Sequence, residues 1–291
     1  MDEIFKNRGR DIIDSSKEII QKAIVDFKPK AIVIMLSGGD DSMTAYHIAR
    51  ILDIKYDFVI HGVTGTGVEE TQRFVEKTVS KNKDRLILAD AGSTYVDYVL
   101  RKGFWGYGLN AHALSYQSLK ATPFRKVMSK FLRQNRRNYP ILLINGARRL
   151  ESENRKKTML NPYRRDPAAL NNIWVNIINE WTHHECIDQL EGDSIDRNPV
   201  SKLVCRSAEC YCGTLQTEGD YTETGYYFPN WKKKMDGIRR AVKKKGFPWD
   251  WGQPIPNNWT LEKNGQGNLF TGFQPMCKGC KVNFQSDGIN E

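Results

Sequence analysis

A glycine-rich stretch near the start of the sequence carries the residue types that hold phosphate groups. Residues 36–42 read L-S-G-G-D-D-S, in which Ser37 and Ser42 supply hydroxyl donors. Gly38 and Gly39 allow a sharp turn that leaves backbone N–H groups exposed, and such groups bind anions. The stretch has neither the spacing of a Walker phosphate loop nor the three glycines of a dinucleotide-binding fingerprint. It predicts a phosphate-binding loop of a different kind.

The cysteines form a second group with its own chemistry. Five of the six lie after residue 200, where a C-x-C pair, Cys210 and Cys212, precedes a C-x-x-C pair, Cys277 and Cys280. Four soft thiolates can hold either an iron–sulfur cluster or a zinc ion, and no histidine follows residue 184 to join them. Cys205 competes for one of the four places, as a substitute ligand or as a reactive thiol.

The elements that must position these residues follow an alternating pattern. The glycine-rich stretch joins an apolar run at residues 31–35 to a segment with helical spacing of apolar residues, so we expect a strand, a turn and a helix. An amphipathic helix is predicted before that strand, at residues 10–27. Further buried strands are predicted at residues 56–61, 85–89, 140–145 and 173–178. Strands that alternate with helices indicate an α/β fold with a doubly wound parallel sheet, covered on both faces.

Composition and charge narrow the class of protein. The chain has 291 residues, with 44 Lys and Arg against 34 Asp and Glu and a net charge of +10. This excess of cations favours a polyanionic partner such as nucleic acid, although it also suits phosphate-rich small substrates. No stretch approaches a membrane span and the N-terminus lacks a signal-peptide core, so a cytoplasmic protein with reduced thiols is expected. A change of composition predicts two domains, residues 1–200 and a cysteine-rich, basic region at 201–291.

Several motifs in one order resemble a single superfamily. S-G-G-x-D-S is similar to the PP-loop of the N-type ATP pyrophosphatases, which split ATP between its α and β phosphates and adenylylate an acceptor oxygen. Other elements resemble the phosphoadenylyl-sulfate reductase-like branch, to which DNA phosphorothioation sulfurtransferases are similar. They are Thr64 with Gly65, Glu70 with Thr71, G-A-R-R-x-E-S at residues 146–152, I-I-x-x-W-T at residues 177–182, and Asn198 with Pro199. The sequence departs from the branch at Val63, where Asp is usual, and at Ile177, where Pro is common.

This resemblance implies a fold and a set of roles. It implies a five-stranded parallel sheet of the adenine nucleotide α-hydrolase type, with ATP across the carboxyl ends of the strands and Mg²⁺ bound with it. Arg148 and Arg149 would neutralise phosphate charge and Asp41 would orient the loop or assist Mg²⁺, so these three are the predicted catalytic residues. A surface ion pair of the arginines with Glu151 or Glu153 is the alternative. The residues predicted to bind the nucleotide are Ser37, Gly38, Gly39, Asp41, Ser42, Thr64, Gly65, Glu70, Arg148 and Arg149.

The resemblance also bears on the cysteines and on the partners. Members of the branch hold an iron–sulfur cluster on cysteine pairs in this part of the chain, so we prefer a [4Fe–4S] cluster to Zn²⁺ at Cys210, Cys212, Cys277 and Cys280. The partners expected from charge and resemblance are nucleic acid, either DNA or RNA, and a cysteine desulfurase or another sulfur donor. A homodimer is the assembly considered.

Other segments keep two interpretations. Residues 231–251 combine runs of Lys and Arg with Trp and Phe, as a nucleic-acid surface requires, but they also read as an amphipathic helix with an ordinary solvated face. A predicted helix at residues 124–137 poses the same choice. His183 and His184, on a helix capped by Thr182, are interpreted as helix surface and not as metal ligands, because adjacent side chains on a helix point about 100° apart. Cys186, on the same helix, is predicted to be a small core residue.

Three functions are compatible with these features. The preferred one is an ATP-dependent sulfurtransferase, which adenylylates an oxygen on nucleic acid and replaces that oxygen with sulfur. The second is a sulfonucleotide reductase, but such reductases use a thiolate beyond the last cluster cysteine and no thiol follows Cys280 here, so Cys205 or another protein would have to serve. The third is a PP-loop subunit that binds nucleic acid without catalysis. The missing thiol and the charge of +10 favour the first.

Overall fold

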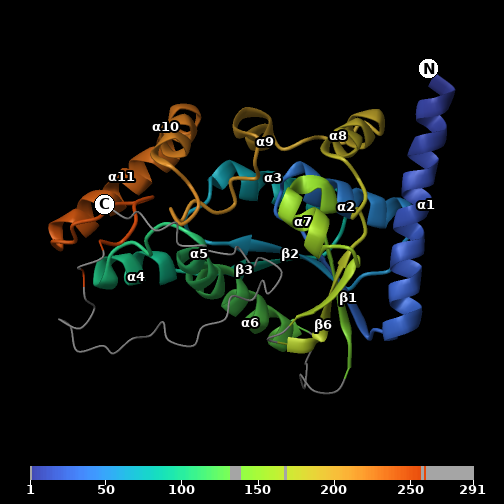
Figure 1. Ribbon diagram of the computed structural model, residues 1–291, viewed down its shortest axis with the longest axis horizontal. Coiled ribbons are helices and arrows are strands. Elements are labelled where there is room, and N and C mark those ends of the chain that lie inside the picture. The colour runs from blue at the N-terminus through green and yellow to red at the C-terminus, as the bar shows by residue number, and fades with distance from the viewer. Residues whose placement is uncertain (1, 132–138, 167–168, 257–258, 260–291) are drawn as a thin grey trace, which may run out of the picture.

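The computed structural model of the protein describes residues 2–131, 139–166, 169–256 and 259 (Figure 1). Its strands are β1 Ala31–Met35, β2 Phe58–Val63, β3 Leu86–Asp90, β4 Ile141–Asn145, β5 Tyr163–Asp166 and β6 Ala169–Asn176. Its α-helices are α1 Asp2–Phe27, α2 Asp40–Ile51, α3 Glu69–Lys81, α4 Thr94–Lys102, α5 Leu109–Tyr116, α6 Thr122–Phe131, α7 Glu153–Thr158, α8 His183–Gly192, α9 Pro199–Val204, α10 Glu218–Tyr227 and α11 Pro229–Lys244. A π-helix, η1 Gln117–Ala121, joins α5 to α6, and a 3₁₀ turn, η2 Arg149–Glu151, precedes α7.

The strands form one mostly parallel sheet in the order β3-β2-β1-β4-β6-β5. Five of these strands, β3, β2, β1, β4 and β6, pair in parallel, which confirms the five parallel strands expected from the sequence. A sixth strand, β5, was not expected, and it pairs antiparallel with β6 at the edge of the sheet. Its sequence is Y-R-R-D, and Arg164 and Arg165 are exposed. An edge strand with charged side chains has no apolar run, which is why the hydrophobic pattern does not reveal it.

Both faces of the sheet are covered by helices, and β1 illustrates how the sequence produces this. Ile32 and Ile34 belong to a core with α1, α2, α3 and α8, whereas Ala31 and Val33 belong to a second core with α6. This alternation follows from the two-residue repeat of a strand. Figure 1 shows α2 and α3 on one side of the sheet and α6 on the other. The doubly wound α/β fold predicted from the sequence is confirmed.

A third core lies beyond the β3 end of the structure and joins segments that are far apart in the chain. It contains Tyr95 of α4 and Trp105, together with Trp231 of α11 and Trp251. A buried indole N–H group helps to hold these segments together. Trp249 Nε1 donates to the carbonyl of Phe104 at 2.8 Å. The division into residues 1–200 and 201–291 stays a prediction, and this core contains residues from both parts.

Several local predictions can be compared directly with the helices. The predicted cap of α8 is present, since Thr182 and Glu185 form a reciprocal capping box. Cys186 is fully buried, which confirms its predicted place in the core. The helix expected at residues 124–137 is observed as α6, and residues 132–138 lie outside the described part. Within the ranges that the structure describes, none of the helices has the length and apolar character needed to cross a bilayer.

Candidate active site

The glycine-rich loop runs from the end of β1 to the start of α2, and the Ser42 hydroxyl lies at its centre. Ser42 Oγ accepts the backbone N–H groups of Ser37 and Gly38 at 3.2 and 3.1 Å, and it donates to the carbonyl of Gly39 at 2.9 Å. Gly38 has φ +84°, a left-handed conformation that glycine adopts without strain. The loop therefore gathers hydroxyl and N–H donors at the amino end of a helix, which is the arrangement that binds a phosphate oxygen.

Asn198 fixes this loop from a distant part of the chain. Its Nδ2 donates to the carbonyl of Gly38 at 2.9 Å and to the hydroxyl of Thr71 at 3.2 Å. Its Oδ1 accepts the N–H of Val200 and so caps α9, where Pro199 occupies the first turn. One fully buried side chain thus joins the loop, α3 and α9. The Asn-Pro pair was noted in the sequence, but this role was not predicted.

Asp40 and Asp41, the two carboxylates of the loop, have different partners. Asp40 is buried and forms two contacts with Arg197, Nε to Oδ1 at 3.1 Å and NH2 to Oδ2 at 2.9 Å. Asp41 lies 2.9 Å from Arg148 Nε through Oδ2 and 3.3 Å from His183 Nδ1 through Oδ1. The Asp40 pair was missed in the sequence because Arg197 is 157 residues away. It orients the first turn of α2 from inside the protein.

Two of the predicted catalytic residues, Asp41 and Arg148, therefore come together at the carboxyl edge of the sheet. Arg148 is buried, and its Nε forms no hydrogen bond although it makes the ionic contact with Asp41. The predicted alternative, an ion pair of this arginine with Glu151 or Glu153, is wrong, since Glu151 pairs with Arg155. A buried guanidinium that a carboxylate holds beside the phosphate loop is suited to an anionic ligand.

Arg149 and His183 extend the polar group around Asp41. Arg149 NH2 lies 3.1 Å from Glu180 Oε2, and its buried Nε forms no hydrogen bond. His183 is on the surface of α8 as predicted, with 52% of its side chain exposed, but its contact with Asp41 was not foreseen. The signal that could have found it is its position directly after Thr182, which places it in the first turn of a helix that begins at the same edge of the sheet.

Gly146 shows how closely the G-A-R-R segment approaches the phosphate loop. A Cβ atom at Gly146 would lie 2.5 Å from the carbonyl carbon and oxygen of Asp41 and from the backbone N of Ser42. The G-A-R-R segment therefore packs directly on the start of α2. A glycine is required because another residue would displace the backbone of the phosphate loop.

The Thr64 and Gly65 pair lies on the neighbouring strand end, where the chain after α9 passes over it. Thr64 Oγ1 donates to the carbonyl of Glu209 at 2.8 Å, and Gly65 has φ +75°. Glu70 is half-buried in the first turn of α3, next to Thr71, whose hydroxyl donates to the carbonyl of Ser207 at 2.5 Å. Residues 207–209 therefore contact both the phosphate loop and the T-G element, and they lie directly before Cys210 in the chain.

Cys210 and Cys212 lie together just beyond this crossing. Cys210 Sγ is 3.7 Å from Thr66 Oγ1, and Cys212 Sγ is 3.2 Å from Thr214 Oγ1 and 3.5 Å from Ser115 Oγ. Hydrogen bonding from Cys210 lowers the pKa of the Cys212 thiol to about 5, with help from the two hydroxyl groups. The same contact and burial raise the pKa of Cys210 well above its usual value.

These thiols fit one half of a four-cysteine site. Cys277 and Cys280, the other predicted ligands, lie outside the described residues. Among the residues that are described, no third His, Cys, Asp or Glu joins the pair. The buried hydroxyl of Tyr95, in the same core as Cys212, forms no hydrogen bond, so the surroundings contain a polar atom without a partner. A group bound by the two thiols is consistent with this arrangement.

A buried ion pair beside Cys210 was not predicted. Lys120, in the π-helix η1, contacts Glu209 with Nζ to Oε2 at 3.0 Å. Burial alone would lower the pKa of Lys120, but the charges of Glu209 and Cys210 raise it above its usual value. A π-helix often occurs at functional sites, yet nothing in the local sequence predicts one.

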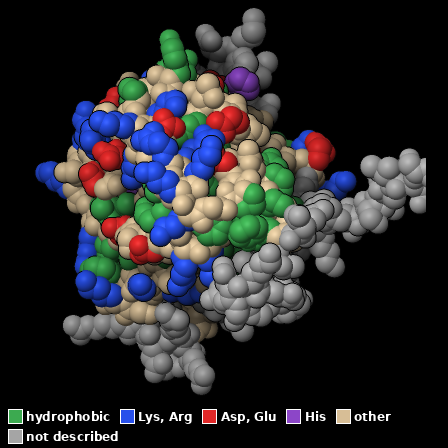
Figure 2. Space-filling view, turned by 90° about the vertical axis from the view of Figure 1, so that its left-hand side faces the viewer, with side chains coloured by type: hydrophobic (Ala, Val, Ile, Leu, Met, Phe, Trp, Pro, Cys, Tyr) green, Lys and Arg blue, Asp and Glu red, His purple; other side chains and the backbone are tan. Residues whose placement is uncertain are grey.

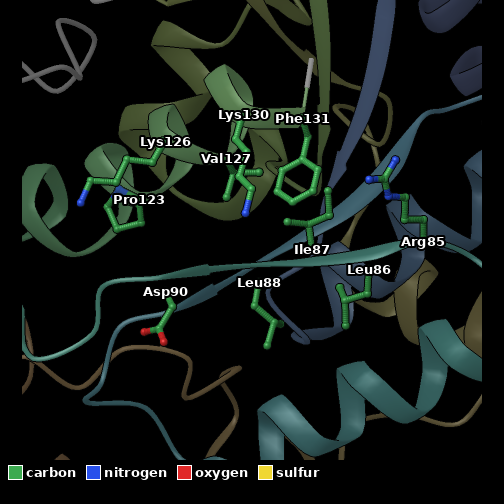
Figure 3. Close-up of a pocket in the computed structure, with 10 residues that line it drawn as sticks. All are labelled: Arg85, Leu86, Ile87, Leu88, Asp90, Pro123, Lys126, Val127, Lys130 and Phe131. Atoms are coloured by element: carbon green, nitrogen blue, oxygen red, sulfur yellow. The ribbon is translucent and has the colours of Figure 1, made fainter. Parts of the chain in front are cut away.

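An open hollow of about 480 Å³ lies elsewhere, between β3 and α6 (Figure 3). It is lined by Leu86 and Ile87 of β3 and by Lys126 and Lys130 of α6, among others. None of the predicted site residues lines it. The predicted residues lie instead at the carboxyl edge of the sheet, and the candidate site is the group around Ser42, Asp41 and Arg148.

The phosphoadenosine phosphosulfate reductase domain family matches residues 31–216 of the chain. The chain belongs to this family. The match extends over nearly the same residues as the resemblance recognised in the sequence, and it confirms that assignment. No protein of curated function matches the chain.

Three solved structures are similar to it at low sequence identity. The phosphoadenylyl-sulfate reductase of Candida auris, in a phosphate complex, is 14% identical, with 65% of this chain and 84% of that chain covered and a TM-score of 0.47. The FMN adenylyltransferase of Candida glabrata is 13% identical, with 68% and 60% covered and a TM-score of 0.47. The same adenylyltransferase with FMN and an ATP analogue is 12% identical, with 68% and 62% covered and a TM-score of 0.47.

Proposed function

We propose that this member of the family is an ATP-dependent sulfurtransferase that acts on nucleic acid in the cytoplasm. The observation that carries the proposal is the site itself: the N–H and hydroxyl groups around Ser42 lie beside Arg148, a buried arginine that Asp41 holds at 2.9 Å. Such a site favours a ligand with several phosphates. The net charge of +10 favours a polyanionic acceptor.

The first step is transfer of the adenylyl group. An oxygen of the acceptor attacks the α-phosphorus of ATP, the bond from that phosphorus to the bridging oxygen breaks, and pyrophosphate leaves. The N–H groups of Ser37 and Gly38 and the Ser37 hydroxyl donate to Ser42 Oγ in this structure, and they would hold the departing pyrophosphate once its oxygens replace Ser42 Oγ as the acceptor. Arg148 and Arg149 would stabilise the charge on the α-phosphate, and Asp41 would keep Arg148 in place.

Mg²⁺ is expected to accompany ATP, because it binds phosphate oxygens and water and needs only one or two protein carboxylates. Asp41 is the carboxylate at the loop that is partly exposed, whereas Asp40 is buried against Arg197. Asp41 is therefore the residue that would contact the ion or a water bound to it.

The second step replaces oxygen with sulfur. A hydrosulfide ion attacks the activated centre of the acceptor, the new bond to sulfur forms, and AMP leaves with the former acceptor oxygen. No oxidant or reductant is needed for this exchange. Cys210 and Cys212, with Cys277 and Cys280, would hold the iron–sulfur cluster, which when bound would supply a place for the sulfur.

A sulfonucleotide reductase is the second candidate, and one observation favours it besides the family. Cys205 is exposed at the end of α9, two residues before Ser207, whose Cβ lies 3.2 Å from a Cβ position on Gly39 of the loop. A thiol at that place could reach a sulfate carried by a nucleotide in the site. In that reaction the thiolate attacks the sulfur atom of an adenylyl sulfate and AMP or its 3′-phosphate leaves, after which a second thiol attacks the cysteine sulfur, forms a disulfide and releases sulfite.

One experiment separates the two functions. The protein is purified without oxygen and analysed for iron and zinc, and nucleic acid from cells with and without it is digested and examined by mass spectrometry. A sulfur-bearing nucleotide that depends on the protein supports the sulfurtransferase. Sulfite released from an adenylyl sulfate by the purified protein in the presence of a thiol reductant, with no change in the nucleic acid, contradicts it and supports the reductase.

A further inference from the structure

Helix α11 concentrates positive charge on its outer side. Its 16 residues contain seven Lys and Arg and one Asp. Trp231, Met235, Ile238 and Val242 form its buried face, so the helix is held against the third core by apolar contacts. The exposed cations of the helix are Lys233, Lys234, Arg240, Lys243 and Lys244, whereas Lys232 and Arg239 lie over the ring of Tyr221. The cations are therefore displayed by a rigid element and not by a loop.

Only some of these cations are neutralised within the protein. Lys232 pairs with Asp236 at 2.9 Å, and Arg239 contacts Asp250 at 2.8 Å and Glu218 at 2.9 Å. Lys233, Arg240 and Lys244 are exposed, and none has an ion-pair partner among the described residues. They are seven and four residues apart, so they follow one face of the helix. We call these three residues the basic stripe. Figure 2 shows Lys and Arg gathered on the side of the molecule where α10 and α11 lie.

Gly237 interrupts the stripe, four residues after Lys233 and three before Arg240. A Cβ atom at Gly237 would have nothing within 4 Å, so packing does not require a glycine there. Glycine in a helix interior is less favourable than alanine. A bare helix surface between cations lets an extended anion approach the backbone closely.

The stripe is joined to the candidate active site by a short, buried connection. Trp231 Nε1, in the first turn of α11, donates to the carbonyl of Thr66 at 2.8 Å. Thr66 follows the T-G element, and the Trp231 ring packs on Tyr211 and Tyr221 with ring centres 5.0 and 5.1 Å apart. Lys233 comes two residues after Trp231. The start of the stripe therefore has a fixed position relative to the site.

We propose that the basic stripe binds the phosphodiester backbone of the nucleic acid that the enzyme modifies. The identity of this ligand as the acceptor rests on the proposed function. The 11 steps from Lys233 to Lys244 rise about 16 Å along the helix, which corresponds to about five phosphates of one strand. Tyr226, 80% exposed at the end of α10, adds a ring on which an unpaired base can stack.

The test compares three full-length variants by fluorescence anisotropy, with a labelled single strand and a duplex of the same sequence. K233Q/R240Q/K244Q removes the stripe, and K17Q/K22Q/K77Q removes the same charge from exposed lysines of α1 and α3. Gly237→Glu places a carboxylate in the stripe at a position with free space and a better helix former, so folding is retained. Each phosphate contact contributes about 0.7–0.9 to the salt slope, so between 50 and 200 mM salt the wild type should lose roughly 20- to 40-fold more affinity than the stripe variant.

Binding by the wild type that falls in the stripe variant and in Gly237→Glu, but not in the matched control, supports the proposal, and the better of the two oligonucleotides gives the form of the acceptor. An equal loss in the control, or no loss in either stripe variant, overturns it. Binding to phosphatidylserine vesicles in place of both oligonucleotides also overturns it. Salt-sensitive binding by the stripe without ATP cleavage would refute the proposed function alone, whereas ATP cleavage with nucleic acid that does not need the stripe would refute this inference alone.

Discussion

Replacing Gly146 by alanine should disturb the phosphate loop without changing any side chain that is proposed to contact the nucleotide. The new Cβ would lie 2.5 Å from backbone atoms of Asp41 and Ser42, and these atoms must retreat by almost 1 Å to reach an ordinary contact of 3.4 Å. Overpacking of this kind costs about 1–3 kcal/mol of folding free energy. A shift of about 1 Å in a binding site reduces activity by about 100-fold. We expect Gly146→Ala to fold, with a lower melting temperature and a rate of ATP consumption that is about 100-fold lower.

The assay measures melting temperature by calorimetry and the rate of ATP consumption by the release of pyrophosphate. Gly192→Ala, at the end of α8, is the matched control, because nothing lies within 4 Å of its Cβ position. The control should keep both quantities. Unchanged stability and an unchanged rate of ATP consumption in Gly146→Ala would refute the argument that the G-A-R-R segment sets the position of the loop.

Three other predictions follow from the same contacts. Asn198→Ala removes the cap of α9 and the donor to Gly38, so it should weaken ATP binding and cost about 1–2 kcal/mol in chemical denaturation, and Asn198→Asp, which keeps the cap but places a buried carboxylate oxygen against the Gly38 carbonyl, should lose more stability; a smaller loss in Asn198→Asp would contradict this. A double-mutant cycle on Asp41→Asn and Arg148→Gln should give a coupling of about 0.5–3 kcal/mol in ATP binding, and additive effects would show that the ion pair does not matter. Iodoacetamide at pH 8 should modify exposed Cys205 and spare Cys186, as peptide mass spectrometry would reveal, because burial raises the pKa of Cys186 to about 12. The folded Cys186 thiol keeps a proton that the unfolded thiol loses, so its contribution to stability is present below the ordinary pKa of 9.0 and is lost as the pH rises toward 12, and Cys186→Ala should show a smaller fall over that range.

The parts of the fold that the sequence predicts are those whose signal is local. Residues 31–35 form a continuous apolar run, and both glycines of the loop follow it within four residues. The strand, the turn and the helix could therefore be recognised together. The cap formed by Thr182 and Glu185 is likewise contained in four residues. The edge strand β5 has charged residues in place of an apolar pattern, and it was missed for that reason.

The contacts that complete the site depend on residues far apart in the chain. Asn198 meets Gly38 across 160 residues, and Lys120 meets Glu209 across 89. A local pattern can show that Asn198 begins a helix, because the cap and the proline are neighbours. It cannot show which loop the free amide group of that side chain will meet, since this depends on how the folded strands bring the two segments together.

Separation of the nucleotide products is the most direct test of the central claim, that the loop around Ser42 holds ATP for cleavage between the α and β phosphates. The protein, purified without oxygen, is incubated with ATP, Mg²⁺, hydrosulfide and total nucleic acid, and the products are resolved by ion-exchange chromatography. The account predicts AMP and pyrophosphate, with formation abolished in Arg148→Gln. ADP and inorganic phosphate as the products, or AMP formation that is unchanged in Arg148→Gln, would contradict it.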